Sequence, residues 1–158
     1  MTKAIFDIDS NGKAVNVTRL QGITSVNRDG IDPTDTQAAG DWLIGFGSDG
    51  HRAYFLGGDV SPEKKDAMLE KIADNIGTRR CLPLPDGGKI SVDIIDEIYM
   101  STKTDCLIIS SIAPRTIIYV AGHDWFSDFD EMLKALSEAL VDISNGRKSD
   151  FKWDEYLA

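Results

Sequence analysis

The sequence predicts an α+β protein made of two tandem copies of one antiparallel β-sheet unit, each closed by a single amphipathic helix. Three observations predict this class. Short alternating apolar runs lie between turn residues, two longer segments carry apolar residues at helical spacing, and the order of these elements recurs along the 158 residues. This length is enough for one sizeable domain or two closely packed small ones.

The first copy begins with a predicted β-hairpin. Two extended runs flank Asn11-Gly12, and this dipeptide tolerates the positive φ that a type I′ turn requires. Further strands are expected at residues 21–27, 42–47 and 53–57. Residues 28–40 are polar, rich in turn formers and without periodicity, so we expect an inserted loop that is functional or mobile.

The first helix is expected to start at Ser61-Pro62-Glu63. Serine is a good N-cap, proline suits the first helical position, and glutamate complements the positive end of the helix dipole. The apolar residues that recur at helical spacing are Met68, Leu69, Ile72 and Ile76. Gly77 is the expected terminator.

The second copy repeats this order. Its strands are expected at residues 80–84, 89–92, 97–101, 106–111 and 116–121. A second helix should begin at Ser127-Asp128-Phe129-Asp130, with Ser127 as N-cap and Asp130 in a capping-box contact, and should end at Asn145-Gly146. Its apolar stripe comprises Phe129, Met132, Leu133, Leu136, Leu140 and Ile143.

An internal duplication is the simplest source of this recurrence. The shift that places Leu43-Ile44 on Leu107-Ile108 also aligns the two helices, and a larger shift places Val15 on Ile90. The two shifts differ because the loop after Arg28 has no counterpart in the second copy. We therefore expect a first copy at 1–77, a second at 78–146 and a C-terminal tail at 147–158, together forming one compact domain.

Charge and composition narrow the functional classes. Lys and Arg total 17 against 26 Asp and Glu, which gives a formal net charge of −9. Binding to nucleic acid or to an anionic membrane needs concentrated positive charge, so neither is expected. The sequence has no apolar stretch suited to a signal peptide or a membrane span, so we expect a cytoplasmic protein. Cys81 and Cys106 should then be free thiols.

The sequence contains only weak matches to metal-binding and catalytic motifs. Asp7-x-Asp9-x-Asn11-Gly12 imitates the start of a calcium loop, but Thr18 stands where a bidentate glutamate is needed. His51 and His123 have no second His or Cys nearby in sequence. Phosphate-binding glycine motifs and the nucleophile elbow are missing from the sequence. No metal, cofactor or catalytic residue is therefore assigned.

Two acidic groups and an aromatic tail remain as candidates for binding a protein partner. The acidic groups precede a strand and surround the start of the second helix, where they could attract a basic partner. Three aromatic residues crowd the last eight positions before the C-terminal alanine, and we favour their docking on the protein's own sheet over docking on a partner. The candidate residues are Asp96, Glu97, Asp124, Asp128, Glu131, Phe151, Trp153 and Tyr156.

These features predict a protein-binding or inhibitory role that acts by protein–protein contact. Small acidic inhibitors, such as immunity proteins of toxins or phage-encoded antagonists of nucleic-acid-binding machinery, fit this composition. Two alternatives stay open. One is a structural component that forms homo-oligomers through sheet edges or the tail, and the other is an enzyme with its site in the cleft between the copies.

Overall fold

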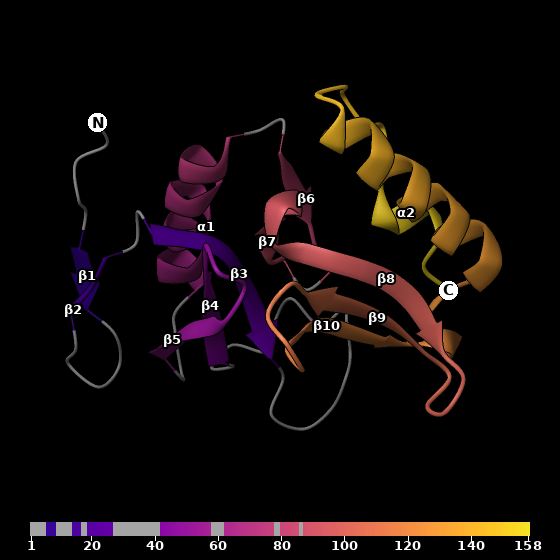
Figure 1. Ribbon diagram of the computed structural model, residues 1–158, viewed down its shortest axis with the longest axis horizontal. Helices are drawn as coiled ribbons and strands as arrows, with labels where there is room; N and C mark the ends of the chain where they lie inside the picture. The colour runs from indigo at the N-terminus through magenta and orange to yellow at the C-terminus, as the bar shows by residue number, and fades with distance from the viewer. Residues whose placement is uncertain are drawn as a thin grey trace.

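A computed structural model describes residues 6–8, 14–16, 19–26, 42–57, 62–77, 80–85 and 87–158. Over these ranges the chain is an α+β protein with two larger antiparallel sheets, a separate two-stranded hairpin and two α-helices (Figure 1). The predicted α+β class and its antiparallel sheets are confirmed. The predicted inserted loop at 28–40 lies outside the described residues.

The first sheet has five strands in the order β5-β4-β3-β7-β6. Their bounds are β3 (Leu20–Val26), β4 (Trp42–Gly47), β5 (Arg52–Gly57), β6 (Cys81–Pro83) and β7 (Lys89–Ser91). Helix α1 (Pro62–Ile76) covers one face, where Met68 and Ile72 pack against Leu20 and Ile23. The middle strand, β3, pairs with β7. A strand that follows α1 in the sequence therefore joins the sheet formed by the three strands that precede α1.

The second sheet has three strands in the order β10-β9-β8. They are β8 (Ile95–Ser101), β9 (Cys106–Ser111) and β10 (Ile117–Gly122). Helix α2 (Phe129–Ser144) packs its apolar stripe on this sheet, and the buried residues of that stripe are Phe129, Met132, Leu136, Ala139 and Ile143. The start of α2 differs from the prediction, because Asp128 is the N-cap and accepts a hydrogen bond from the Glu131 amide.

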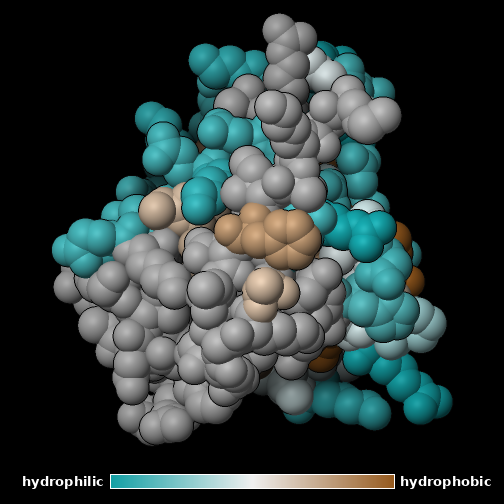
Figure 2. Space-filling model, turned by 90° about the vertical axis from the view of Figure 1, so that its left-hand side faces the viewer, coloured by the Kyte–Doolittle hydropathy of each residue, from teal (hydrophilic) through white to brown (hydrophobic). Residues whose placement is uncertain are grey.

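The hairpin formed by β1 (Phe6–Ile8) and β2 (Ala14–Asn16) stands apart from both larger sheets. Its strands pair antiparallel, as expected, while the Asn11-Gly12 turn lies outside the described residues. In Figure 1 the hairpin lies at the left end of the molecule, beyond α1 and far from β8. The space-filling view of that end shows a small apolar patch at the surface (Figure 2). Phe6 is 62% exposed.

The element bounds repeat along the chain. β6, β7 and β8 follow β1, β2 and β3, respectively, at one constant offset, and each has the same length as its counterpart. The first series of strands begins at Phe6, Ala14 and Leu20, and the second begins at Cys81, Lys89 and Ile95. β9 likewise has the same length as β4. Each series consists of a hairpin, three consecutive strands and a helix in the same order.

The aromatic residues near the C-terminus form a cluster that packs against the core beneath α2. The Trp153 ring is buried, and its Nε1 donates a hydrogen bond of 2.7 Å to the Pro83 carbonyl of β6. Phe151 lies edge-on to Trp153 and stacks on Tyr156. Across the described ranges, neither α-helix has the length and apolarity that crossing a membrane would need.

Candidate functional site

Strand β8 forms an open edge of the second sheet. It pairs with β9 on one side, and no described strand pairs with its other side. The exposure of its side chains reflects this. Tyr99 is 37% exposed and Ile98 is half-buried, whereas Ile23 of β3, which has strands on both sides, is 0% exposed. An edge of this kind presents unpaired main-chain donors and acceptors to a further strand.

A groove of about 350 Å³ runs beside this edge, between β8 and the C-terminal half of α2. Its apolar lining comes from both elements, and Val141 of α2 is 54% exposed. The lining residues are Arg80, Val92, Ile95, Asp96, Glu97, Ile98, Ser137, Leu140, Val141 and Ser144. The groove thus combines an open main-chain edge with an apolar floor, which suits an extended peptide segment.

The net charge of the groove is negative. Arg80 is paired with Asp93, and its guanidinium hydrogen bond holds the pKa of the Asp93 carboxyl below its usual range. The exposed carboxylates of Asp96 and Glu97 take part in no salt bridge with the residues that the structure describes. Two of the sequence-predicted residues therefore lie in the groove, and no described residue forms a salt bridge with either of them.

The second acidic group lies elsewhere. Asp124 belongs to the short 3₁₀ turn His123–Trp125, Asp128 caps α2, and Glu131 is in its first turn. The groove contacts α2 from Ser137 onwards, and Ser137 is about 12 Å further along the helix axis than Phe129. The structure therefore does not bring Asp124, Asp128 and Glu131 together with Asp96 and Glu97.

The aromatic tail lies beside this second acidic group. The Ser127 amide donates to the Tyr156 carbonyl at 2.8 Å, and the Ala158 amide donates to the Trp125 carbonyl at 2.8 Å. Trp153 is only 6% exposed, so it serves as a core residue of this chain. Phe151 and Tyr156 are half-buried and keep part of their surface accessible.

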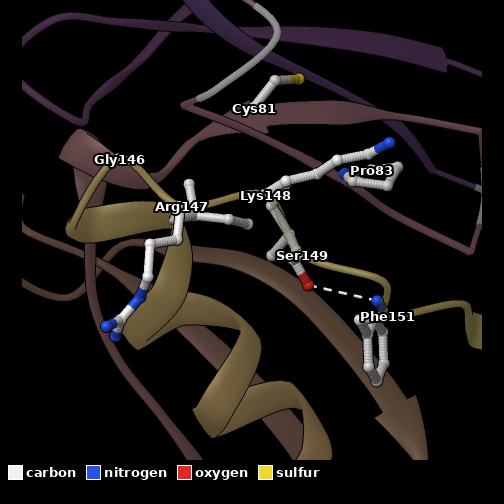
Figure 3. Close-up of a pocket in the computed structure, with 9 residues that line it drawn as sticks. Cys81, Pro83, Gly146, Arg147, Lys148, Ser149 and Phe151 are labelled. Atoms are coloured by element: carbon white, nitrogen blue, oxygen red, sulfur yellow. Dashed lines mark hydrogen bonds between the residues drawn. The ribbon is translucent and has the colours of Figure 1, made fainter.

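A second cavity, of about 490 Å³, lies between β6 and the segment that follows α2 (Figure 3). Arg147 and Lys148 supply positive charge, although Arg147 also pairs with Asp142 at 3.1 Å and its guanidinium points away from Lys148 and Pro83 in the figure. Cys81 contributes to the lining, and burial raises the pKa of its thiol. A raised pKa leaves less of the nucleophilic thiolate, which favours a structural role for this cysteine.

Among the described residues, neither histidine belongs to a cluster of possible metal ligands. His51 is exposed and pairs with Asp49, and His123 stacks on Phe129 at 5.0 Å. Over the described part of the chain, no group of three or more His, Cys, Asp or Glu side chains is placed to hold a metal ion.

Sequence reasoning did not find the apolar part of the groove. Leu140 was assigned to the inward stripe of α2, and Val141 falls outside that stripe. The only available signal was the Leu140-Val141 pair itself, because an exposed valine beside the stripe widens the apolar face of the helix. Comparison with known protein families, curated proteins and solved structures gives no match for this chain.

Proposed function

We propose that this chain is a non-catalytic protein-binding protein that takes up an extended segment of a basic protein partner along β8. One observation carries the proposal: the open edge of β8 adjoins a groove that has an apolar floor and an acidic rim. In this mode the main chain provides affinity, while alternate side chains of the bound strand provide specificity.

Charge complementarity determines the chemistry of the partner. The chain carries a net charge of −9, and Asp96 and Glu97 lie at the edge that the partner would approach. A segment that alternates apolar and basic residues would place the apolar side chains towards Ile98 and Val141. Its Lys or Arg residues would lie near the carboxylates, where they would accelerate association and disfavour acidic competitors.

An inhibitory action would follow from this mode of binding. The basic segments of nucleic-acid-binding proteins contact phosphates through Lys and Arg. A segment held against β8 would be withdrawn from such contacts. We therefore retain an antagonist of nucleic-acid-binding machinery as the specific form of the proposed function.

We also propose that the two halves descend from one duplicated unit. The supporting observation is the constant offset between β1, β2, β3 and their counterparts β6, β7 and β8. Because three strands keep their lengths as well as their spacing, a chance similarity of two β-rich segments is a poorer explanation. The aromatic tail then follows as a segment outside both units.

Synthetic peptides test the binding proposal. One set alternates apolar residues with Lys or Arg, and a matched set alternates them with Glu. We expect the wild-type protein to bind the basic set in fluorescence anisotropy, and the double variant Asp96→Lys, Glu97→Lys to bind it at least tenfold more weakly. Equal binding of both peptide sets would contradict the proposal.

A matched charge reversal provides the control. Glu70 and Glu138 are exposed on α1 and α2, and neither lines the groove. The variant Glu70→Lys, Glu138→Lys changes the net charge as much as the groove variant does. If this control loses as much binding as the groove variant, the effect comes from overall charge and the proposed site is wrong.

A further inference from the structure

We infer that the chain's own β1–β2 hairpin can occupy the β8 edge, with β2 paired antiparallel to β8. The hairpin then acts as an intramolecular strap over the groove. As a statement about regulation, this inference rests on the proposed function of the groove. As a statement about strand pairing, it rests on the pairing seen in the first sheet and on the constant offset between the two series of strands.

The first sheet supplies the template. There the β6–β7 hairpin completes the sheet by pairing β7 with β3, in the register Gly22↔Ile90 and Ile23↔Lys89. The strand β8 corresponds to β3, and β2 corresponds to β7, at the constant offset between the two series of strands. Transferring the register gives Glu97↔Val15 and Ile98↔Ala14.

The connecting segments have equal lengths. Three residues, Val92–Ile94, lead from β7 in the first sheet to β8 in the second. Three residues also separate the end of β2 at Asn16 from the start of β3 at Leu20. A connection of this length already carries the chain from one sheet to the other, so β2 can reach the second sheet while β3 stays in the first.

The residues at matching positions of the β3–β7 pair and of the proposed β8–β2 pair differ in size in opposite directions. A Cβ at Gly22 would lie 2.5 Å from Cδ1 of Ile90, so a larger residue at this position of β3 would require the end of the Ile90 side chain to shift. The corresponding position of β8 is Glu97, and that of β2 is valine, a residue type without a δ carbon. The smaller partner leaves room for the larger residue on β8.

The hairpin and the groove expose complementary apolar surfaces. Phe6 pairs with Asn16, and Asn16 lies two residues from Ala14, so Phe6 and Ala14 share one face of the hairpin. In the transferred register this face lies on the same side of the sheet as Ile98, which lines the groove with Val141. Docking would therefore bury Phe6, now 62% exposed, near Val141, now 54% exposed.

Both partners gain from docking. A lone two-stranded hairpin is at best marginally stable in water, and an open edge strand invites pairing with other chains. Because the hairpin is tethered to the same chain, its effective concentration at β8 is high, on the order of millimolar for a short flexible connection. A protein partner must displace it, which makes binding to the groove conditional on release of the strap.

A disulfide between β2 and β8 tests the pairing. The variant carries Ala14→Cys and Ile98→Cys in a background of Cys81→Ala and Cys106→Ala. Directly opposed residues on paired strands lie within disulfide reach. Under mild oxidation we expect most of the protein to form a disulfide within the monomer, detected by loss of free thiols at monomer mass.

A misplaced cysteine is the control. In the variant Ala14→Cys, Tyr99→Cys, which keeps Phe6, the second thiol lies on the opposite face of β8 from Ile98 and cannot meet the first in the proposed register. This control should retain its thiols. Equal oxidation of both variants, or free thiols in both, would overturn the inference. Disulfide-linked dimers as the main product would overturn it in favour of pairing between two copies.

Hydrogen exchange provides a test without engineered cysteines. In the variant Phe6→Asp the exposed ring is replaced by a charge that the apolar groove does not accommodate. We expect the amides of residues 95–101 to exchange several-fold faster in this variant than in the wild type, while those of β3 are unchanged. Identical exchange at 95–101 would contradict docking.

Binding of the basic peptides separates this inference from the proposed function. The oxidised Ala14→Cys, Ile98→Cys variant should bind these peptides at least tenfold more weakly than the same variant after reduction. If the disulfide forms but neither the wild type nor the Phe6→Asp variant, in which Ile98 is intact, binds the basic peptides, the proposed function fails and the strap remains. If the wild type binds peptide but the disulfide does not form, the strap fails and the proposed function remains.

Discussion

The Ser111 hydroxyl donates a hydrogen bond to the main-chain carbonyl of Gly50, and this contact joins the two sheets. Gly50 lies in the turn between β4 and β5, and Ser111 is the last residue of β9. The same hydroxyl accepts a hydrogen bond from the Ala113 amide, so one buried group organises the turns at the ends of both sheets. An unpaired polar group at this position would cost about 1–3 kcal/mol.

We predict that Gly50→Ala destabilises the protein more than an ordinary turn substitution does. Gly50 has φ +79°, and a Cβ there would lie 2.3 Å from Ser111 Oγ and 2.7 Å from Ile112 Cγ1. Gly77 has φ +86° with no atom within 4 Å of its Cβ position, so Gly77→Ala carries the backbone strain alone. Urea denaturation should show a loss of about 1–2 kcal/mol for Gly77→Ala and a clearly larger loss for Gly50→Ala. Equal losses would show that the turn adjusts freely.

The Trp153 side chain should contribute to stability through both its ring and its indole N–H. Trp153→Phe keeps an aromatic ring but removes the donor to the Pro83 carbonyl, and we expect a loss of about 1 kcal/mol. Trp153→Ala also empties a buried site, and we expect about 3–5 kcal/mol. Both values can be obtained from denaturant titrations. Similar losses for the two variants would show that packing of the ring contributes little.

Stability in acid should depend in part on Asp93. Because the hydrogen bond from Arg80 lowers the pKa of Asp93 in the folded state, the folded protein favours the ionised carboxylate. Its contribution is fully present above the pKa of the unfolded state, about 3.9, and is lost as the pH falls through the lower folded value. Asp93→Asn should therefore reduce the difference in urea midpoint between pH 7 and pH 2, and Arg80→Gln should do the same. An unchanged difference in both variants would exclude this pair as a source of the pH dependence.

The Cys81 thiol should react slowly with alkylating reagents. Burial raises its pKa, so less thiolate is present near neutral pH than for an ordinary cysteine. In a Cys106→Ala background, iodoacetamide should modify the folded protein much more slowly than the urea-unfolded protein, and the rate should continue to rise above pH 9. A plateau near neutral pH would indicate an activated thiol instead.

Individual strands and helix ends were predictable because residues close in sequence specify them. The bounds of β4 and β9 agree with the expected residues 42–47 and 106–111, where apolar runs lie between turn formers. The end of α1 at Ile76 follows from Gly77, whose φ of +86° suits glycine. The candidate residues Asp96 and Glu97 were named from charge alone, and the structure places both in the groove.

Longer-range relationships were not predictable. Ser127 was expected to cap α2, but its amide and its hydroxyl both donate to the distant Tyr156 carbonyl, and Asp128 takes the capping position. The pairing of β3 with β7 and the groove beside β8 depend on how the two sheets and α2 come together. Periodicity in the sequence contains no information on such pairings.

The path of the chain through the first sheet has a consequence for fragments. Because β6 and β7 follow α1 yet complete the sheet that α1 covers, residues 1–77 alone would lack two of its five strands. Ile23 and the α1 face beneath it would then border water where β7 normally lies. Extending the N-terminal piece to residue 91 restores those strands, so autonomous folding should depend on where the chain is cut, and the proposed repeat unit, residues 1–77, differs from the fragment that holds all five strands.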